Sequence, residues 1–116
     1  MKKAISAEKV LIDLGGKPIP LDPTTGGSLT VGVAMGIILQ GYRGNEKGGA
    51  MADPLKCLNL ARDFYKAQSP IELDSVDIKL VERAVRDDKR FGNLVLGQLL
   101  EALEEATEVV EGSKVK

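Results

Sequence analysis

The chain of 116 residues contains no histidine and a single cysteine, Cys57. Without histidine it cannot form a Ser-His or Cys-His catalytic arrangement, and it lacks the commonest metal-binding side chain. One cysteine cannot make an internal disulfide or a thiolate zinc site, and this usage is typical of a reducing cytosol. Cys57 lies on the apolar face of a predicted helix, which favours a buried side chain over a nucleophile. We therefore expect a cytoplasmic protein that is not an enzyme and uses no metal or cofactor.

Aromatic residues, net charge and long apolar runs are also scarce. Aromatics make up 3% of the chain, which predicts an aliphatic core, and the formal net charge is −1. So small a charge gives no electrostatic reason to expect a nucleic acid or an anionic membrane as partner. The longest apolar run, residues 30–40, is shorter than the roughly 20 residues that span a bilayer. Charged residues at positions 8, 9 and 13 interrupt any apolar region of an export signal, so none is expected.

The run SLTVGVAMGIILQ, residues 28–40, is the most apolar stretch of the chain. As a helix it would be apolar on every side, which indicates burial, with Ser28 capping its start and Gly41 ending it. Gly32 and Gly36 lie one turn apart and would let another backbone come close. Apolar residues also alternate with small ones along the run, as in a buried strand. The length of the run and its two end signals favour the helix.

Before this run, residues 8–22 have the pattern of a β-hairpin. Apolar residues precede and follow Gly15-Gly16, where a turn with positive φ costs little. Pro18 and Pro20 cannot donate to a ladder, which makes the second strand an edge or irregular. Residues 1–7 are expected to be a flexible arm.

After the run, three amphipathic helices are predicted. They cover residues 54–67, 75–86 and 93–110, with Asp53, Asp74 and Asn93 as their N-caps. The predicted fold is α+β and mainly α: an N-terminal β-hairpin followed by about four helices packed around the apolar central helix. Residues 8–110 would form a single globular domain, with a disordered tail at residues 111–116.

The glycine-rich segment GYRGNEKGGA, residues 41–50, is predicted to be a mobile loop. It does not match the phosphate-binding pattern G-x-x-x-x-G-K-[ST], because Lys47 precedes a glycine and no Ser or Thr follows. A loop that becomes ordered on a partner is the functional alternative, with Tyr42, Arg43, Asn45 and Lys47 as candidate contact residues.

Two further patterns favour structural interpretations. Asp87-Asp88 is flanked by Arg86, Lys89 and Arg90, which would oppose a bound cation, so a solvated helix break is the better account. The helices at 54–67 and 75–86 are joined by more than the 3–4 residues of a helix-turn-helix motif. DNA binding is therefore disfavoured but stays the alternative function.

The end of the last predicted helix suggests self-association. Val109 and Val110 extend its apolar face beyond what a small domain can cover, next to Leu103. A homodimer would bury this side against its copy about a two-fold axis.

The order of several short motifs resembles small proteins encoded in phage and prophage regions, mostly uncharacterised. The motif positions are Leu29-Thr30, Lys56, Leu60-Ala61, Tyr65, Pro70-Ile71-Glu72-Leu73, Asp77-Ile78, Val95, Gly97-Gln98-Leu99 and Leu103. The resemblance implies a phage origin, a bacterial host and no known activity. The glycine-rich loop departs from the pattern, so nothing about a partner at that loop carries over. The leading hypothesis is a non-catalytic interaction or assembly factor that acts through protein–protein contacts; the alternative is a small nucleic-acid-binding regulator.

Overall fold

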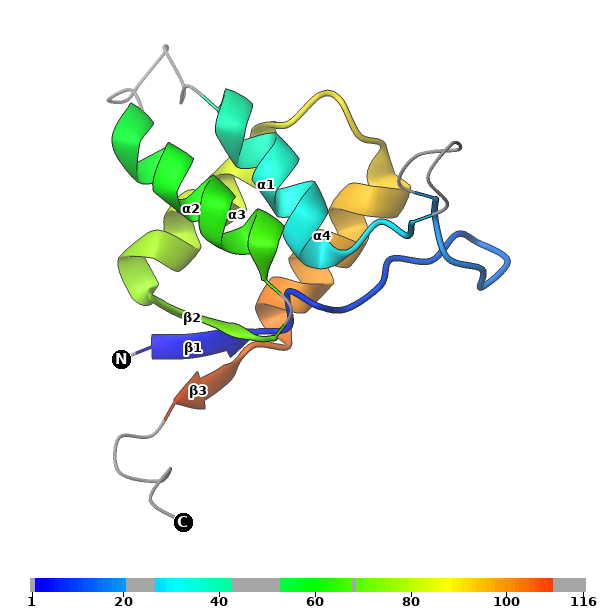
Figure 1. Cartoon of the computed structure of the whole chain (residues 1–116), viewed down its shortest axis with the longest axis horizontal. Coiled ribbons are helices and arrows are strands. Elements are labelled where there is room, and N and C mark those ends of the chain that lie inside the picture. The colour runs from blue at the N-terminus through cyan, green and yellow to red at the C-terminus, as the bar shows by residue number, and fades with distance from the viewer. Residues whose placement is uncertain (1, 21–26, 43–52, 68, 110–116) are drawn as a thin grey trace.

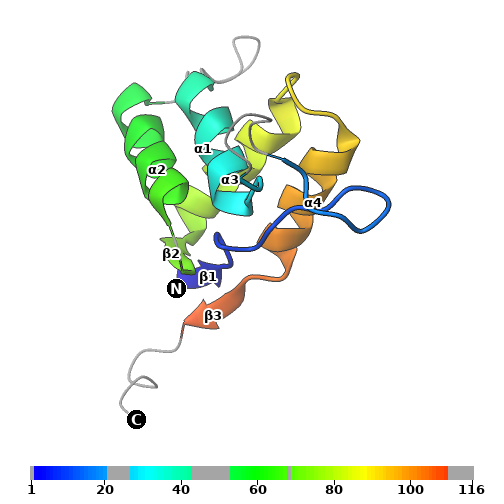
Figure 2. The same ribbon diagram turned by 45° about the vertical axis from the view of Figure 1, so that its right-hand side comes forward.

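The computed structural model describes residues 2–20, 27–42, 53–67 and 69–109 (Figure 1). This part of the chain forms four helices and one three-stranded antiparallel sheet, so the predicted α+β, mainly helical class is confirmed. The elements in chain order are β1 (Lys2–Ile5), α1 (Val31–Gly41), α2 (Pro54–Lys66), β2 (Ile71–Asp74), α3 (Ser75–Asp87), α4 (Asn93–Glu104) and β3 (Thr107–Val109). The helices lie together on one side of the sheet (Figures 1 and 2).

The helix starts follow short-range side-chain chemistry. Asp53 accepts a hydrogen bond from the Leu55 amide at the start of α2, and Asp74 accepts one from the Asp77 amide at the start of α3, both as predicted. The predicted caps of the other two helices are wrong. Thr30, not Ser28, caps α1 by accepting from the Val33 amide, because Ser28 lies in an extended pairing with Pro20. Gly92 precedes α4 with no side-chain cap.

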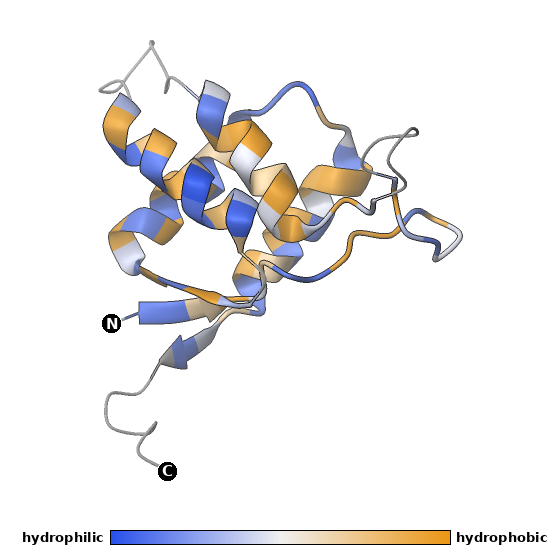
Figure 3. Cartoon of the chain, viewed as in Figure 1, coloured by the Kyte–Doolittle hydropathy of each residue, from blue (hydrophilic) through white to orange (hydrophobic). Residues whose placement is uncertain are grey.

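Helix α1 packs against α2, α3 and α4, but it is not buried on every side as the sequence suggested. Its buried residues are Val31, Gly32, Ala34, Met35, Gly36, Ile38 and Leu39. Val33 and Ile37 are only half-buried and Gln40 is exposed, and these three positions fall on one side of the helix. This side of α1 is therefore only partly covered by the rest of the described chain. Figure 3 shows α1 as hydrophobic or neutral except near its C-terminal end, whereas α2 alternates between the two colours.

The close approach that Gly32 and Gly36 were expected to allow is present between α1 and α2. A Cβ at position 32 would collide with the carbonyl oxygen of Phe64, and one at position 36 would lie 3.0 Å from the carbonyl oxygen of Ala61. Two glycines on one face thus let α2 lie directly against the backbone of α1.

The sheet has the order β2-β1-β3, so the first residues of the chain form its central strand. Ile5 is opposite Ile71 of β2, and Lys2 is opposite Val109 of β3. The flexible arm expected at residues 1–7 is therefore wrong over Lys2–Ile5, since Ile5 is fully buried in the common core. The last helix was also predicted too long. It ends at Glu104, and Thr107–Val109 pairs with β1, which suits β-branched residues better than a helix does.

Residues 8–20 form a turn of hairpin type, in rough agreement with the prediction. The Asp13 amide donates to the Lys17 carbonyl over 2.7 Å, and Gly16 adopts a φ of 86°, which favours glycine. Leu11 and Ile19 also bond to Leu29, so the segment before α1 joins this pair. The pairings are isolated bridges rather than regular strands. Residues 21–22, at the end of the predicted hairpin, lie outside the described residues.

The core joins residues from the sheet, the hairpin and all four helices. Among the described residues Phe64 is the only aromatic side chain in the fully buried set, so the prediction of an aliphatic core is confirmed there. No polar or charged residue of the described ranges is buried. The core is therefore held together by apolar packing.

Candidate protein-binding groove

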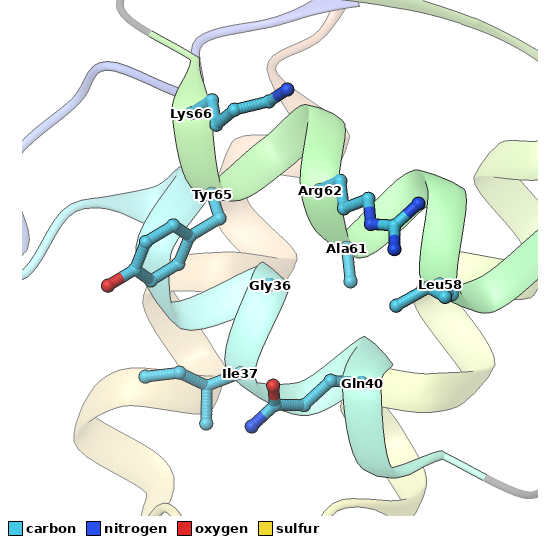
Figure 4. A pocket seen from close by; sticks show the side chains of 8 residues that line it. All are labelled: Gly36, Ile37, Gln40, Leu58, Ala61, Arg62, Tyr65 and Lys66. Atoms are coloured by element: carbon cyan, nitrogen blue, oxygen red, sulfur yellow. The ribbon is translucent and has the colours of Figure 1, made fainter.

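A hollow with a volume of about 580 Å³ lies between α1 and α2. Figure 4 shows side chains from both helices around it. The lining residues are Gly36, Ile37, Gln40, Leu58, Ala61, Arg62, Tyr65 and Lys66. We call this hollow the α1/α2 groove. It lies beside the partly exposed side of α1, where Ile37 and Gln40 are.

The α1/α2 groove combines a narrow base, apolar sides and a polar rim. Its base is formed by the small residues Gly36 and Ala61, both buried, where the two helices lie in close contact. Leu58 and Tyr65 stand above this base from α2 and are 39% and 54% exposed. Apolar side chains left in water around a depression are typical of a contact surface.

Arg62 and Lys66 supply positive charge to the rim of the groove. They lie one turn apart on α2, and both are exposed. Neither forms an ion pair with any residue in the described ranges. The rim is therefore cationic, although the whole chain has a net charge of −1.

The sequence does not reveal this groove directly, because on a helical wheel Leu58 and Tyr65 fall on the same apolar half of the helix as its buried residues. The structure buries Cys57, Leu60, Ala61 and Phe64 and leaves the other two outside. A signal was present in the sequence: Leu55, Leu58, Arg62 and Tyr65 follow spacings of three, four and three residues. That pattern forms a second stripe along α2, separate from the buried one.

A second hollow lies beside the C-terminal end of α1. The polar side chains around it form hydrogen bonds with one another and with the backbone of α1. The Tyr42 hydroxyl donates to Asp87 Oδ2 over 3.0 Å, and burial together with this bond raises the pKa of Tyr42. Arg90 Nη2 donates to the carbonyls of Ile37 and Ile38, which caps the end of α1. Asp88, in turn, accepts from the side chain of Arg90. These contacts complete the C-terminal end of α1.

The carboxylate pair lies at the end of α3, where a helix break was predicted, but the side chain of Asp88 is only 4% exposed and is therefore not solvated as expected. Asp87 accepts a hydrogen bond from the Tyr42 hydroxyl, while Asp88 accepts hydrogen bonds from the backbone amides of Arg90 and Phe91 directly after α3. The two carboxylates therefore face different partners. No cluster of three metal-ligating side chains occurs within the residues that the structure describes.

The predicted site residues do not come together as one site. Tyr42 belongs to the end of α1, whereas Arg43, Asn45 and Lys47 lie outside the described residues. Leu103 is only 8% exposed and belongs to the core of its own chain. Val109 is in β3 opposite Lys2, and Val110 lies outside the described residues. Self-association through Leu103, Val109 and Val110 stays a prediction. Leu103 is too buried to form the centre of such an interface.

Cys57 is 3% exposed on the buried face of α2. Burial, with a smaller contribution from the nearby Asp53 carboxylate, raises the pKa of its thiol. A nucleophilic cysteine needs a lowered pKa and access to solvent, so this thiol has the properties of a core residue.

Helices α2 and α3 do not form a helix-turn-helix, because β2 lies between them and pairs with β1. None of the helices in the described ranges has the length and apolar character needed to cross a membrane. Comparison with protein-family models, curated proteins and solved structures finds no match to this chain.

Proposed function

We propose that this protein is a non-catalytic interaction or assembly factor, and that its protein partner docks in the α1/α2 groove. The observation that carries the proposal is the exposure of Leu58 and Tyr65 around a base made of Gly36 and Ala61. A phage or prophage origin and action in the cytoplasm of a bacterial host belong to the same proposal, on the resemblance of the motifs alone.

The shape and composition of the groove favour a protein as its ligand. Interface hot spots are enriched in Tyr and Arg, and they combine a pocket for one apolar side chain with a surrounding rim that excludes water. Tyr65 and Arg62 are such residues, and Leu58 adds an apolar wall. A small-molecule site would enclose most of its ligand, whereas the exposure of Tyr65 and Leu58 leaves this groove open along α2.

Capture with a matched pair of variants tests the proposal. The tagged protein is incubated with lysate of its source organism, and retained proteins are quantified for wild type, Leu58→Gln and Asn59→Gln. Leu58 lines the groove, while Asn59 is an exposed neighbour on the same helix outside it. A partner of the groove should be retained about tenfold less by Leu58→Gln, since a polar amide in place of a central apolar contact costs more than about 1 kcal/mol of binding free energy.

The control Asn59→Gln should retain the same partner as wild type does. Unfolding midpoints of both variants should match that of wild type, because both positions are on the surface. Equal retention by Leu58→Gln and wild type would refute docking in the groove.

A further inference from the structure

We infer that the ligand of the α1/α2 groove is an amphipathic helix that carries carboxylates beside its apolar stripe. This inference rests on the proposed function and specifies the chemistry of the partner. It is carried by the stripe Leu55, Leu58, Arg62 and Tyr65 and by the unpaired charge of Arg62 and Lys66 among the described residues.

The spacing of the stripe favours a helix over an extended peptide. Side chains three, four and three residues apart lie along one line of α2. This is the spacing with which one helix receives the side chains of another in knobs-into-holes packing. An extended strand repeats every two residues and cannot match it over several turns. The stripe is exposed along its length, from Leu55 at 64% to Tyr65 at 54%, so a helix can lie against it.

The base of the groove adds space for one large apolar side chain. Because Gly36 and Ala61 project little, the volume of about 580 Å³ remains open between Leu58 and Tyr65. Half-buried Ile37 closes the side toward α1. A leucine, methionine or phenylalanine of the partner helix would occupy part of this space and exclude water from it.

The charge of the rim sets the polarity of the partner. Arg62 lies within the stripe and Lys66 one turn further along α2, and the nearest carboxylate in sequence, Asp63, does not line the groove. Successive residues of a helix are about 100° apart, so Asp63 lies on an adjoining side of α2 and outside the lining of the groove. Carboxylates on a docked helix would meet both cations, and a basic helix would be repelled.

The inference is tested by fluorescence anisotropy with designed peptides of about four helical turns. The acidic peptide has leucines at alternating three- and four-residue spacing, flanked by glutamates. A matched peptide has lysine in place of each glutamate, and a third has the leucines replaced by serine. The acidic peptide should bind wild type, and the other two should bind at least about tenfold more weakly.

A charge exchange gives the decisive result. The double variant Arg62→Glu, Lys66→Glu should prefer the basic peptide, while Lys79→Glu, an exposed change on α3, should leave the preference for the acidic peptide intact. Preference for the acidic peptide in the double variant, or equal binding of all three peptides, would overturn the inference.

This failure is distinguishable from failure of the proposed function. If no helical peptide binds but Leu58→Gln still loses its partner from lysate, the groove is a protein site with a ligand of other chemistry, and the inference is wrong. If Leu58→Gln loses nothing from lysate, the proposed function itself is wrong.

Discussion

The side-chain amide of Gln98 is bonded in both directions to the backbone of Ile12, 86 residues earlier in the chain. Its oxygen accepts from the Ile12 amide over 3.0 Å, and its nitrogen donates to the Ile12 carbonyl over 2.8 Å. The same nitrogen also donates to the Leu94 carbonyl within α4. A single side chain thus reproduces the pairing of a β-bridge and fastens the hairpin to α4.

We expect Gln98→Ala to lower the free energy of unfolding by about 1–2 kcal/mol, because two hydrogen bonds between the hairpin and α4 are lost. Gln98→Glu keeps an acceptor for the Ile12 amide but sets a carboxylate against the Ile12 carbonyl, so its cost should be at least as large. Urea unfolding measures both. Glu101→Ala, an exposed change on α4, should alter the midpoint little, and an equal loss there would contradict the assignment.

The helices were predictable because their signals are local. Asp53 and Asp74 bond to amides two or three residues away, and the apolar faces of α2 and α3 repeat at the helical period. Ser28 and Thr30 are both good caps, and only the extended pairing of Ser28 with Pro20 decides between them. Such a pairing depends on residues outside the helix.

The sheet was missed because its pairing is between distant segments. Lys2–Ile5 contains one fully buried residue, and nothing in four residues indicates that they pair with positions near 72 and 108. The groove was missed for a related reason. The apolar sector of α2 is wider than the surface of α1 that covers it. A helical wheel shows how wide the apolar sector is, but it does not show how much of that sector the neighbouring helix covers.

The glycines of α1 and α4 should respond to alanine in opposite directions. Gly32→Ala should destabilise the fold by about 1–3 kcal/mol or more, because the new Cβ meets the backbone of α2. At Gly97, inside α4, an added Cβ would have no neighbouring atom within 4 Å, so Gly97→Ala should stabilise by about 0.5–1 kcal/mol. Thermal unfolding followed by circular dichroism compares them. A neutral Gly32→Ala would show that α1 and α2 are not in close contact.

Stability should fall at alkaline pH. The folded state raises the pKa of Cys57 above 9.0 by burial, of Tyr42 above 10.0 by burial and its bond to Asp87, and of Lys56 above 10.5 by its bond to Asp77. A raised pKa contributes stability that is complete below the unfolded value and is lost as pH rises through the folded value. Unfolding midpoints in urea should therefore be insensitive to these groups at neutral pH and fall above about pH 9.

Two variants separate the contributions to this alkaline loss. In Cys57→Ala the loss of stability with rising pH should begin only toward about pH 10. Tyr42→Phe should remove the part of the loss that comes from ionisation of the tyrosine. The thiol of the native protein should also react slowly with a thiol reagent at neutral pH and quickly in denaturant. Fast native reaction would contradict the burial of Cys57.

The strand at the N-terminus makes the last prediction. Ile5 is fully buried between the sheet and the helices, so Ile5→Ala should cost about 2–5 kcal/mol of unfolding free energy. Lys2→Ala, at an exposed position of the same strand, should change stability by less than about 0.5 kcal/mol. Removing residues 1–5 should leave β2 and β3 without the strand that joins them, and their amides should then exchange faster with solvent. Hydrogen exchange and urea unfolding measure these effects. A flexible arm would give the opposite result: Ile5→Ala and the truncation would both leave the midpoint and the exchange of Ile71–Asp74 unchanged.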